Sequence, residues 1–312
     1  MTLRFTLRQL EYFVAVGECG SIAGASEKVN VTAPSISAAL SQLQKEFGLP
    51  LFVRKHAQGL SLTQPGRPFM VQAKQVLAEA HALNRLAGDI SGSVQGPLSV
   101  GCLLTFAQLL VPALRRGFSK QYPHVQLSQF ELNQMEILEG LRRGEIDLAL
   151  TYDMYLPQDL EFVPLRTLPP FAMLYDTHPL AHMPSVSVED LADYPMILLD
   201  LPISSDYFMS FFRLSGLRPN IVERTRDMEV LRALVANGFG YSIANIRPFD
   251  DRSPDGRALR FVPLTGPVNA MELGLIMAPE ARNAGVIQAF AKHCRAEMDA
   301  WGFPGHSLTA AP

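Results

Sequence analysis

The sequence predicts an α/β protein with three parts: a small helical head, one long helix, and a body of alternating strands and helices. Apolar residues recur at helical spacing through the first part of the chain, and cap residues separate the runs. A heptad-spaced run then covers residues 69–90. Beyond residue 97, short apolar runs alternate with amphipathic segments, which is the pattern of parallel sheets joined by helices.

The first predicted helix begins after Thr6. Thr6 and Gln9 have the spacing of a capping box, in which each side chain bonds the backbone N–H of the other residue. Apolar residues follow at helical spacing, and Gly17 and Gly20 are expected to end the helix.

Two further helices follow at short intervals. Ser21 is expected to cap the second helix, and Asn30 begins a tight turn. Thr32 is expected to cap a third helix, which tolerates Pro34 in its first turn. The expected buried stripe of the third helix is Ile36, Leu40, Leu43 and Phe47. Two short helices joined by such a turn form a helix-turn-helix, whose second helix can enter a major groove, although a structural three-helix cap fits the spacing equally well.

The outward face of the third helix is polar, and hydroxyls and amides at a helix N-terminus can bond phosphates and base edges. Its outward positions are Thr32, Ser35, Ser37, Ala38, Ser41, Gln42 and Lys45. Residues 51–54 and 60–63 then predict a two-stranded wing, on which Arg54, Lys55 and His56 can reach DNA.

The heptad-spaced run predicts how the chain assembles. Its members are Phe69, Ala73, Val76, Ala80, Leu83, Ala87 and Ile90. An ordinary amphipathic helix packed on its own domain would show similar spacing. Three alanines in one register favour close approach of a second helix, and hence a homodimer that presents two recognition helices to two half-sites.

The first ninety residues and the rest of the chain differ in the sign of their net charge. The chain carries a formal charge of −3, which argues against nucleic-acid binding, but residues 1–90 hold nine Lys/Arg against six Asp/Glu. A basic head on an acidic body is compatible with a nucleic-acid module joined to another function.

Residues 7–66 resemble the winged helix-turn-helix of LysR-type transcriptional regulators, without a gap. The shared motifs are the opening Leu-x-Gln-Leu-x-Tyr-Phe, the Gly-Ser before the second helix, the Pro-x-x-Ser of the third helix and the Leu-Phe-x-Arg of the wing. Many members carry a polar residue and an arginine where this chain has Ala33 and Ala38. The resemblance therefore implies the following DNA-binding residues: Ser21, Thr32, Ser35, Ser37, Gln42, Arg54 and Lys55.

The body is expected to form two α/β lobes. Expected strands cover residues 98–103, 125–132, 146–150, 196–200, 221–225, 241–246 and 272–277. Expected helices cover residues 106–120, 135–143, 207–215, 228–237 and 286–301. Segments near 163–165 and 263–268 are expected to cross between the lobes. The body resembles the two-lobed, type 2 periplasmic-binding-protein-like effector domain of the same family, so the resemblance is essentially full length.

The resulting domain prediction has four parts. They are a winged helix-turn-helix DNA-binding domain (1–63), a linker and dimerisation helix (64–90), an effector-binding domain (91–302) and a flexible tail (303–312). Within the effector-binding domain, lobe I covers 91–163 and 267–302, and lobe II covers 164–266.

Four predicted strand-to-helix junctions are candidates for the effector site, because ligands bind at the carboxyl ends of strands in open α/β sheets. The candidate effector-binding residues are Leu104, Thr105, Asn133, Gln134, Ser204, Ser205 and Met228. Hydroxyl, amide and free N–H donors suit a carboxylate or another anion, and nearby Leu and Met favour a partly apolar ligand. Taken singly, each residue is equally well explained as an ordinary helix cap.

Enzyme and metal functions find no support. The sequence contains no phosphate-binding loop, HExxH or GxSxG motif, and the histidines are dispersed, so no cofactor, metal or catalytic residue is predicted. Cys19, Cys102 and Cys294 predict no disulfide framework; a redox pair of the last two requires that the fold bring them together.

The function prediction is a DNA-binding transcriptional regulator that responds to a small-molecule effector held between the lobes. Its expected partners are double-stranded operator DNA, the effector, and further copies in a homodimer or homotetramer. No stretch approaches twenty apolar residues and no signal peptide is present, so a cytoplasmic protein without a membrane partner is expected. The alternative is a solute-binding protein of periplasmic-binding type without a DNA role; the head and the missing signal peptide weigh against it.

Overall fold

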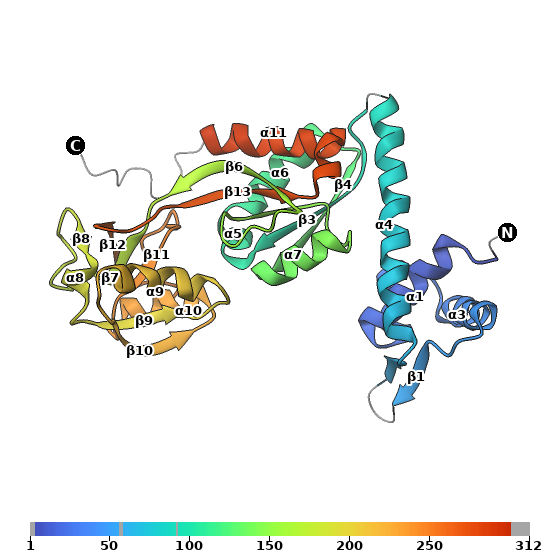
Figure 1. The fold of residues 1–312 in the computed structure, drawn as a ribbon, viewed down its shortest axis with the longest axis horizontal. Helices are drawn as coiled ribbons and strands as arrows, with labels where there is room; N and C mark the ends of the chain where they lie inside the picture. Colours follow the sequence, from blue (N-terminus) through green and yellow to red (C-terminus); the bar gives the residue numbers. More distant parts are fainter. Residues whose placement is uncertain (1–3, 56–58, 92, 301–312) are drawn as a thin grey trace.

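The computed structural model describes residues 4–55, 59–91 and 93–300. Figure 1 shows the head and the long helix α4 at one end, the first lobe of the body beside α4, and the second lobe at the far end. The predicted tail at 303–312 and the expected wing residue His56 lie outside the described residues. No helix in the described part of the chain has the length and apolar content needed to cross a bilayer.

The head contains the three predicted helices and the wing. Its elements are α1 (Leu7–Cys19), α2 (Ile22–Val29), α3 (Ala33–Phe47), β1 (Phe52–Lys55) and β2 (Gly59–Leu62). The capping box of Thr6 and Gln9 is confirmed. Gly17 does not end α1: the helix continues through it and ends before Gly20, whose φ of 63° closes the helix in the left-handed conformation.

The caps of α2 and α3 differ. The Ser21 hydroxyl accepts the Gly24 N–H at 3.1 Å, so the predicted cap of α2 is confirmed. Thr32 precedes α3, but its hydroxyl bonds the Ser35 hydroxyl at 2.9 Å and caps no backbone N–H.

The buried stripe of α3 is shorter than predicted. Ile36, Leu40 and Leu43 are buried, whereas Phe47 is 38% exposed. Phe47 lies in the last turn of α3, where its ring contacts Phe5 and Phe69 at centroid distances of 5.3 and 4.8 Å at the margin of the core.

The wing is fixed to the head by a close backbone approach. The Leu60 N–H donates to the Gly20 carbonyl at 2.7 Å. A Cβ at Gly59, whose φ is 81°, would lie 2.5 Å from the same oxygen, so this position requires glycine.

Helix α4 (Gly66–Ser91) only partly matches the predicted seam. Ala73 is buried in the core of its own head, and Phe69 and Val76 pack against that core. Leu83 is 67% exposed, so it is open to a second chain. The first half of the run therefore serves the head, as the alternative interpretation held; the side chains at 87 and 90 lie outside those described.

The lobe next to α4, lobe I, has a five-stranded sheet in the order β4-β3-β5-β13-β6. Its elements are β3 (Gly96–Leu103), α5 (Leu104–Leu109), α6 (Val111–Gln121), β4 (Val125–Leu132), α7 (Gln134–Arg142), β5 (Leu148–Tyr152), β6 (Glu161–Leu168), β13 (Met271–Met277), η1 (Pro279–Asn283) and α11 (Gly285–Ala300). The first three strands are parallel, but β13 pairs antiparallel with β5 and β6, so the sheet is mixed. The single helix expected at 106–120 is interrupted at Leu110, because Pro112 has no N–H to continue the ladder.

Lobe II departs further from the parallel pattern. Its elements are β7 (Phe171–Tyr175), β8 (Val186–Ser187), α8 (Val188–Leu191), β9 (Pro195–Leu199), α9 (Ser204–Leu214), β10 (Asn220–Thr225), α10 (Met228–Ala236), β11 (Ser242–Ala244) and β12 (Leu259–Thr265). Strand β7, which the sequence interpretation missed, pairs antiparallel with β11 and β12. Strands β9 and β10 are parallel, as expected.

The chain crosses between the lobes later than expected. Strand β6 stays paired with β13 to Leu168, past the expected crossing at 163–165. Strand β12 stays paired in lobe II to Thr265, so the return lies at 266–270. We call the two crossing segments, 169–170 and 266–270, the hinge.

Candidate functional site

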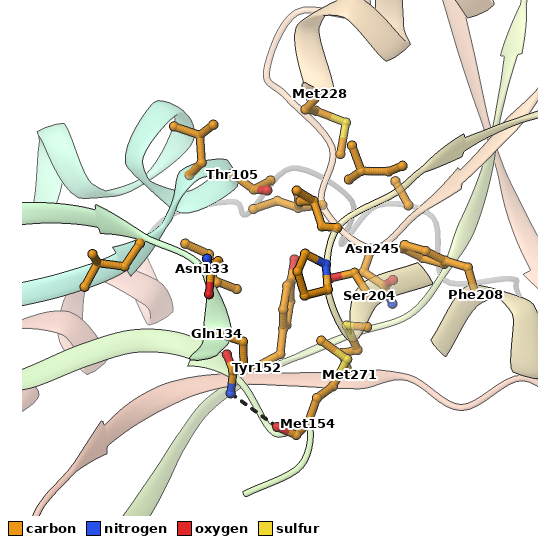
Figure 2. Close-up of a pocket in the computed structure, with 18 of the residues that line it drawn as sticks. Thr105, Asn133, Gln134, Tyr152, Met154, Ser204, Phe208, Met228, Asn245 and Met271 are labelled. Carbon is orange, nitrogen blue, oxygen red and sulfur yellow. Dashed lines mark hydrogen bonds between the residues drawn. The ribbon is translucent and has the colours of Figure 1, made fainter. Parts of the chain in front are cut away.

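A cavity of about 250 Å³ lies between the lobes. Figure 2 shows side chains from both lobes around it, with Thr105 and Asn133 on one side and Met228 and Phe208 on the other. The ends of β3, β4 and β5 and the starts of α5 and α7 form its lobe I wall. The ends of β9 and β11 and the starts of α9 and α10 form its lobe II wall.

The structure brings six of the seven predicted effector residues to this cavity. They are Leu104, Thr105, Asn133, Gln134, Ser204 and Met228. Ser205 does not line the cavity; it is half-buried in the first turn of α9, where its N–H donates to the Leu201 carbonyl at 3.2 Å.

Several lining residues were missed by the sequence interpretation. They are Glu131, Leu132, Tyr152, Met154, Leu199, Leu201, Pro202, Phe208, Ala244, Asn245, Ile246 and Met271. Tyr152 ends β5 and Asn245 follows β11, so the strand-end rule would have found both. The strand at 146–150 was placed two residues early, and no helix follows β11 to mark a junction.

Two predicted residues already have partners within the chain. The side-chain oxygen Oδ1 of Asn133 accepts the Glu136 N–H at 3.0 Å, and the Glu136 carboxylate accepts the Asn133 N–H at 2.8 Å. Gln134 is buried; it donates to the Met154 carbonyl at 3.2 Å and accepts from the Thr151 hydroxyl. The Asn133 side chain therefore caps α7, and the Gln134 side chain holds the start of α7 against β5 and the loop that follows it.

Hydrogen bonds also tie the hinge together beside the cavity. The Asn245 amide donates to the Leu168 carbonyl at 2.8 Å and to the Tyr207 hydroxyl oxygen at 2.9 Å. The Tyr207 hydroxyl donates to the Asn269 carbonyl at 2.6 Å. Leu168 precedes one crossing segment and Asn269 lies in the other, so Asn245 and Tyr207 join α9 and β11 to both.

Three hydroxyls remain for a ligand. Those of Thr105, Tyr152 and Ser204 line the cavity and have no hydrogen-bond partner among the described residues. Tyr152 is 7% exposed, and its ring lies 4.8 Å from the ring of Phe106. Figure 2 shows its hydroxyl pointing into the space between the lobes. Burial raises the pKa of Tyr152, so the hydroxyl stays protonated at neutral pH.

The charge of the lining is low. Glu131 is the one charged side chain among the described lining residues, and Lys, Arg and His are absent from that set. Glu131 is exposed, and its carboxylate accepts from the Gln129 amide at 2.7 Å. The lining is therefore mostly apolar, with a few neutral hydroxyls and amides and one exposed carboxylate.

The predicted DNA-binding residues lie on the head as expected from helix periodicity. Thr32, Ser35, Ser37 and Gln42 are exposed on α3, opposite its buried stripe. Arg54 is exposed on β1, and Lys55 ends the same strand.

Three of the side chains predicted to bind DNA also form hydrogen bonds within the head. Gln42 accepts from the Gln9 amide at 3.0 Å, and the hydroxyls of Thr32 and Ser35 bond each other.

The cysteines remain free thiols. Cys102 and Cys294 are buried in the same lobe I core, and Cys19 is exposed. Burial raises the pKa of Cys102 to about 12 and also raises the pKa of Cys294, so neither is a reactive thiolate. The described residues contain no cluster of His, Cys, Asp and Glu that could hold a metal ion.

Comparison with known proteins gives matches over both parts. The family model described as LysR substrate binding domain matches residues 91–299, and the model described as bacterial regulatory helix-turn-helix protein, lysR family, matches residues 7–67. The chain is 28% identical over 256 residues to the HTH-type transcriptional regulator CysB of Burkholderia cenocepacia, covering 80% of each protein.

Solved structures agree with these matches. HinK, a LysR family transcriptional regulator from Pseudomonas aeruginosa, is 36% identical with a TM-score of 0.63, and the match covers 94% of this chain and 99% of HinK. Full-length CbnR in complex with its target DNA is 24% identical with a TM-score of 0.67, over 94% of this chain and 99% of CbnR. At that identity the likeness to CbnR shows the fold alone.

Proposed function

The chain belongs to the LysR family of transcriptional regulators, and we propose that its interlobe cavity is the site where a small-molecule effector controls DNA binding. The observation that supports this most is that both lobes contribute side chains to one cavity, Thr105 and Tyr152 from lobe I and Ser204 and Met228 from lobe II. A molecule that contacts both walls favours one degree of lobe closure. It therefore shifts the population of conformations that the heads can present to DNA.

The DNA contacts divide by position on the head. We assign base-facing roles to Thr32, Ser35, Ser37 and Gln42 on the exposed face of α3, because the buried stripe fixes which side of this helix can enter the major groove. Ser21, Arg54 and Lys55 are assigned to the phosphate backbone or minor groove. We also propose four domains: a DNA-binding head (1–63), a linker helix (64–90), an effector domain (91–302) and a tail (303–312).

The proposed oligomer of this chain forms through α4. The second half of this helix, in which Leu83 and Leu86 are exposed, is proposed to pair with a second copy in a homodimer, and two dimers are proposed to form a homotetramer. The relatives that match are transcriptional regulators and not enzymes. The predicted carboxylate effector remains a prediction.

The DNA role is tested by gel shift with the region upstream of the chain's own gene. Wild type should retard this DNA with an affinity that falls steeply as salt rises, because phosphate contacts release counterions. Arg54→Ala should weaken binding to all sequences alike. The control Arg218→Ala removes an exposed arginine from lobe II and should leave binding unchanged. Absence of a retarded band at low salt would contradict the proposal.

The effector role is tested by thermal shift against a metabolite collection. A true ligand stabilises the folded chain by mass action. Leu104→Trp places a larger side chain at the half-open edge of the cavity and should abolish the stabilisation. Equal stabilisation of wild type and Leu104→Trp would place the ligand elsewhere.

A further inference from the structure

The helix starts around the cavity differ in what they offer an anion. At α7 the capping box brings the Glu136 carboxylate to the first turn. At α10 the Asp227 carboxylate accepts the Glu229 and Val230 N–H groups at 2.7 and 3.1 Å. Each of these two helix starts already holds a negative side chain, so a bound carboxylate there would meet like charge.

At the start of α9 the backbone N–H groups are not free to bind an anion, for a different reason. Ile203 has a φ of 73°, a conformation that a β-branched residue rarely adopts, and the turn it makes lets the Ser204 N–H donate to the Pro202 carbonyl at 2.9 Å. The Ser205 N–H donates to the Leu201 carbonyl. The first N–H groups of α9 are therefore turned back onto the preceding loop and away from a ligand. The remaining helix start is that of α5. This helix has only six residues, so few aligned peptide dipoles are available to attract an anion.

An anion in this cavity would also lack a cationic partner. Among the described residues of the lining, the single charge is the negative Glu131. Burying a carboxylate without a paired cation is strongly unfavourable. A neutral ligand does not incur that cost.

Tyr152 is the most buried of the three free hydroxyls. Its ring is held by Phe106, and its hydroxyl reaches the cavity (Figure 2) without a protein partner among the described residues. A buried polar group that is positioned but unpaired discriminates between ligands, because a ligand that cannot bond it leaves it unsatisfied. A hydroxyl can donate or accept, so it can pair with an alcohol or a carbonyl.

We propose that the effector is an uncharged, chiefly apolar molecule with a hydroxyl or carbonyl group, and that the Tyr152 hydroxyl binds this group and selects for it. Thr105 and Ser204 provide further hydroxyls on the two lobes, so the same ligand can bridge the cleft. The inference rests on the proposed function of the cavity.

The test uses three probes of the same shape: benzyl alcohol, toluene and benzoate. Ligand-observed NMR titration gives an apparent Kd for each probe on the full chain. Wild type should bind benzyl alcohol about threefold to tenfold more tightly than toluene, the range that one hydrogen bond supports. Benzoate should bind most weakly.

Tyr152→Phe keeps the ring and removes only the hydroxyl. This variant should lose the preference for benzyl alcohol while its Kd for toluene stays unchanged. Tyr122→Phe is the matched control, because Tyr122 packs on Phe118 and does not line the cavity. It should behave like wild type. Leu104→Trp should weaken all three probes.

The contrary outcomes are distinct. Tightest binding by benzoate, or an unchanged benzyl alcohol preference in Tyr152→Phe, would overturn the inference and leave the cavity as the effector site. Absence of benzyl alcohol binding would overturn the inference alone, and probe binding that Leu104→Trp does not weaken would overturn both the inference and the proposed function of the cavity.

Discussion

Individual polar residues around the cavity have different tasks, although the sequence presents them alike. Asn133 and Gln134 were predicted as ligand contacts on the same grounds as Thr105 and Ser204. The structure shows that the first two bond their own backbone and neighbours. The sequence identifies the start of a helix, but it does not show whether a side chain there is already hydrogen-bonded within the protein. For Gln134 the partners are Thr151 and Met154, which come from another strand and the loop after it.

Gln134 should therefore matter for stability. Gln134→Ala leaves the Thr151 hydroxyl and the Met154 carbonyl without their partner in the interior, and the free energy of unfolding should fall by about 1–3 kcal/mol. Urea denaturation measures the change. Gln126→Ala makes the same substitution at an exposed position of β4 and should cost less than about 0.5 kcal/mol. Equal effects would show that the Gln134 bonds do not stabilise the fold.

His178 should give lobe II a pH dependence. It is 3% exposed, its ring nitrogen accepts the Leu180 N–H at 3.1 Å, and burial lowers its pKa below the ordinary 6.5. In the unfolded chain this histidine gains a proton near pH 6.5, whereas in the folded chain it stays neutral to lower pH. The unfolded state therefore binds more protons in that window, and stability falls as the pH drops below about 6.5.

The measurement is urea denaturation between pH 5 and 7.5. His178→Leu should show a shallower loss of stability on acidification than wild type. His182→Leu, at a nearby exposed position, should keep the wild-type slope. A His178→Leu slope equal to that of wild type would contradict the assignment.

At the scale of elements, α7 links the cavity to the linker helix. Its first turn lies at the cavity, and just after its end Glu145 lies 2.8 Å from the Lys74 ammonium of α4. Lys74 also lies 2.9 Å from Glu18 of the head. A Cβ at Gly144, whose φ is 64°, would lie 2.5 Å from the Ala78 Cβ, so α4 approaches the lobe closely at this point.

Removing the Lys74 cation should loosen this junction. Lys74→Met leaves the carboxylates of Glu18 and Glu145 facing each other without the charge that joins them. Spin labels on the exposed Cys19 and on a cysteine placed at Glu139 should report a broader distance distribution. Lys28→Met removes a cation that pairs with Glu18 inside the head only, and it should leave the distribution narrow. An unchanged distribution in Lys74→Met would show that other contacts hold the junction.

The elements predicted from sequence were those with strong local signals. The strand at 125–132 and the start of α10 at Met228 were placed correctly, because alternation and a capping aspartate mark them. Strand β7 is a short apolar run after two prolines, which local periodicity cannot assign to a partner. Its antiparallel pairing with β11 and β12 depends on residues about seventy to ninety positions later in the chain.

In the whole molecule, the head and α4, which hold the basic residues 1–90, lie at one end, and the second lobe of the acidic body lies at the other (Figure 1). A homodimer would bring two heads to two half-sites, and α4 is the helix proposed to join the two copies. Spacing alone could not show which part of the predicted heptad run packs on its own head and which part is left for a second chain. A dimer seam and an ordinary amphipathic helix both use the same apolar positions.

Leu83→Glu should therefore break the assembly. It places like charges where two copies of α4 are proposed to meet, and sedimentation should show a shift to monomer with loss of operator binding. Leu214→Glu makes the same change at a comparably exposed leucine, 62% against 67%, outside α4 and should keep the wild-type mass. An unchanged mass for Leu83→Glu would refute this use of α4.

Occupation of the interlobe cavity is proposed to change how the heads bind DNA. The most direct test of this proposal is a nuclease footprint over the upstream region, with and without saturating benzyl alcohol, on wild type and on Leu104→Trp. We expect the probe to change the extent or strength of the wild-type footprint and to leave that of Leu104→Trp unaltered. A wild-type footprint that is unaffected while the probe is bound, or equal responses of the two proteins, would contradict it.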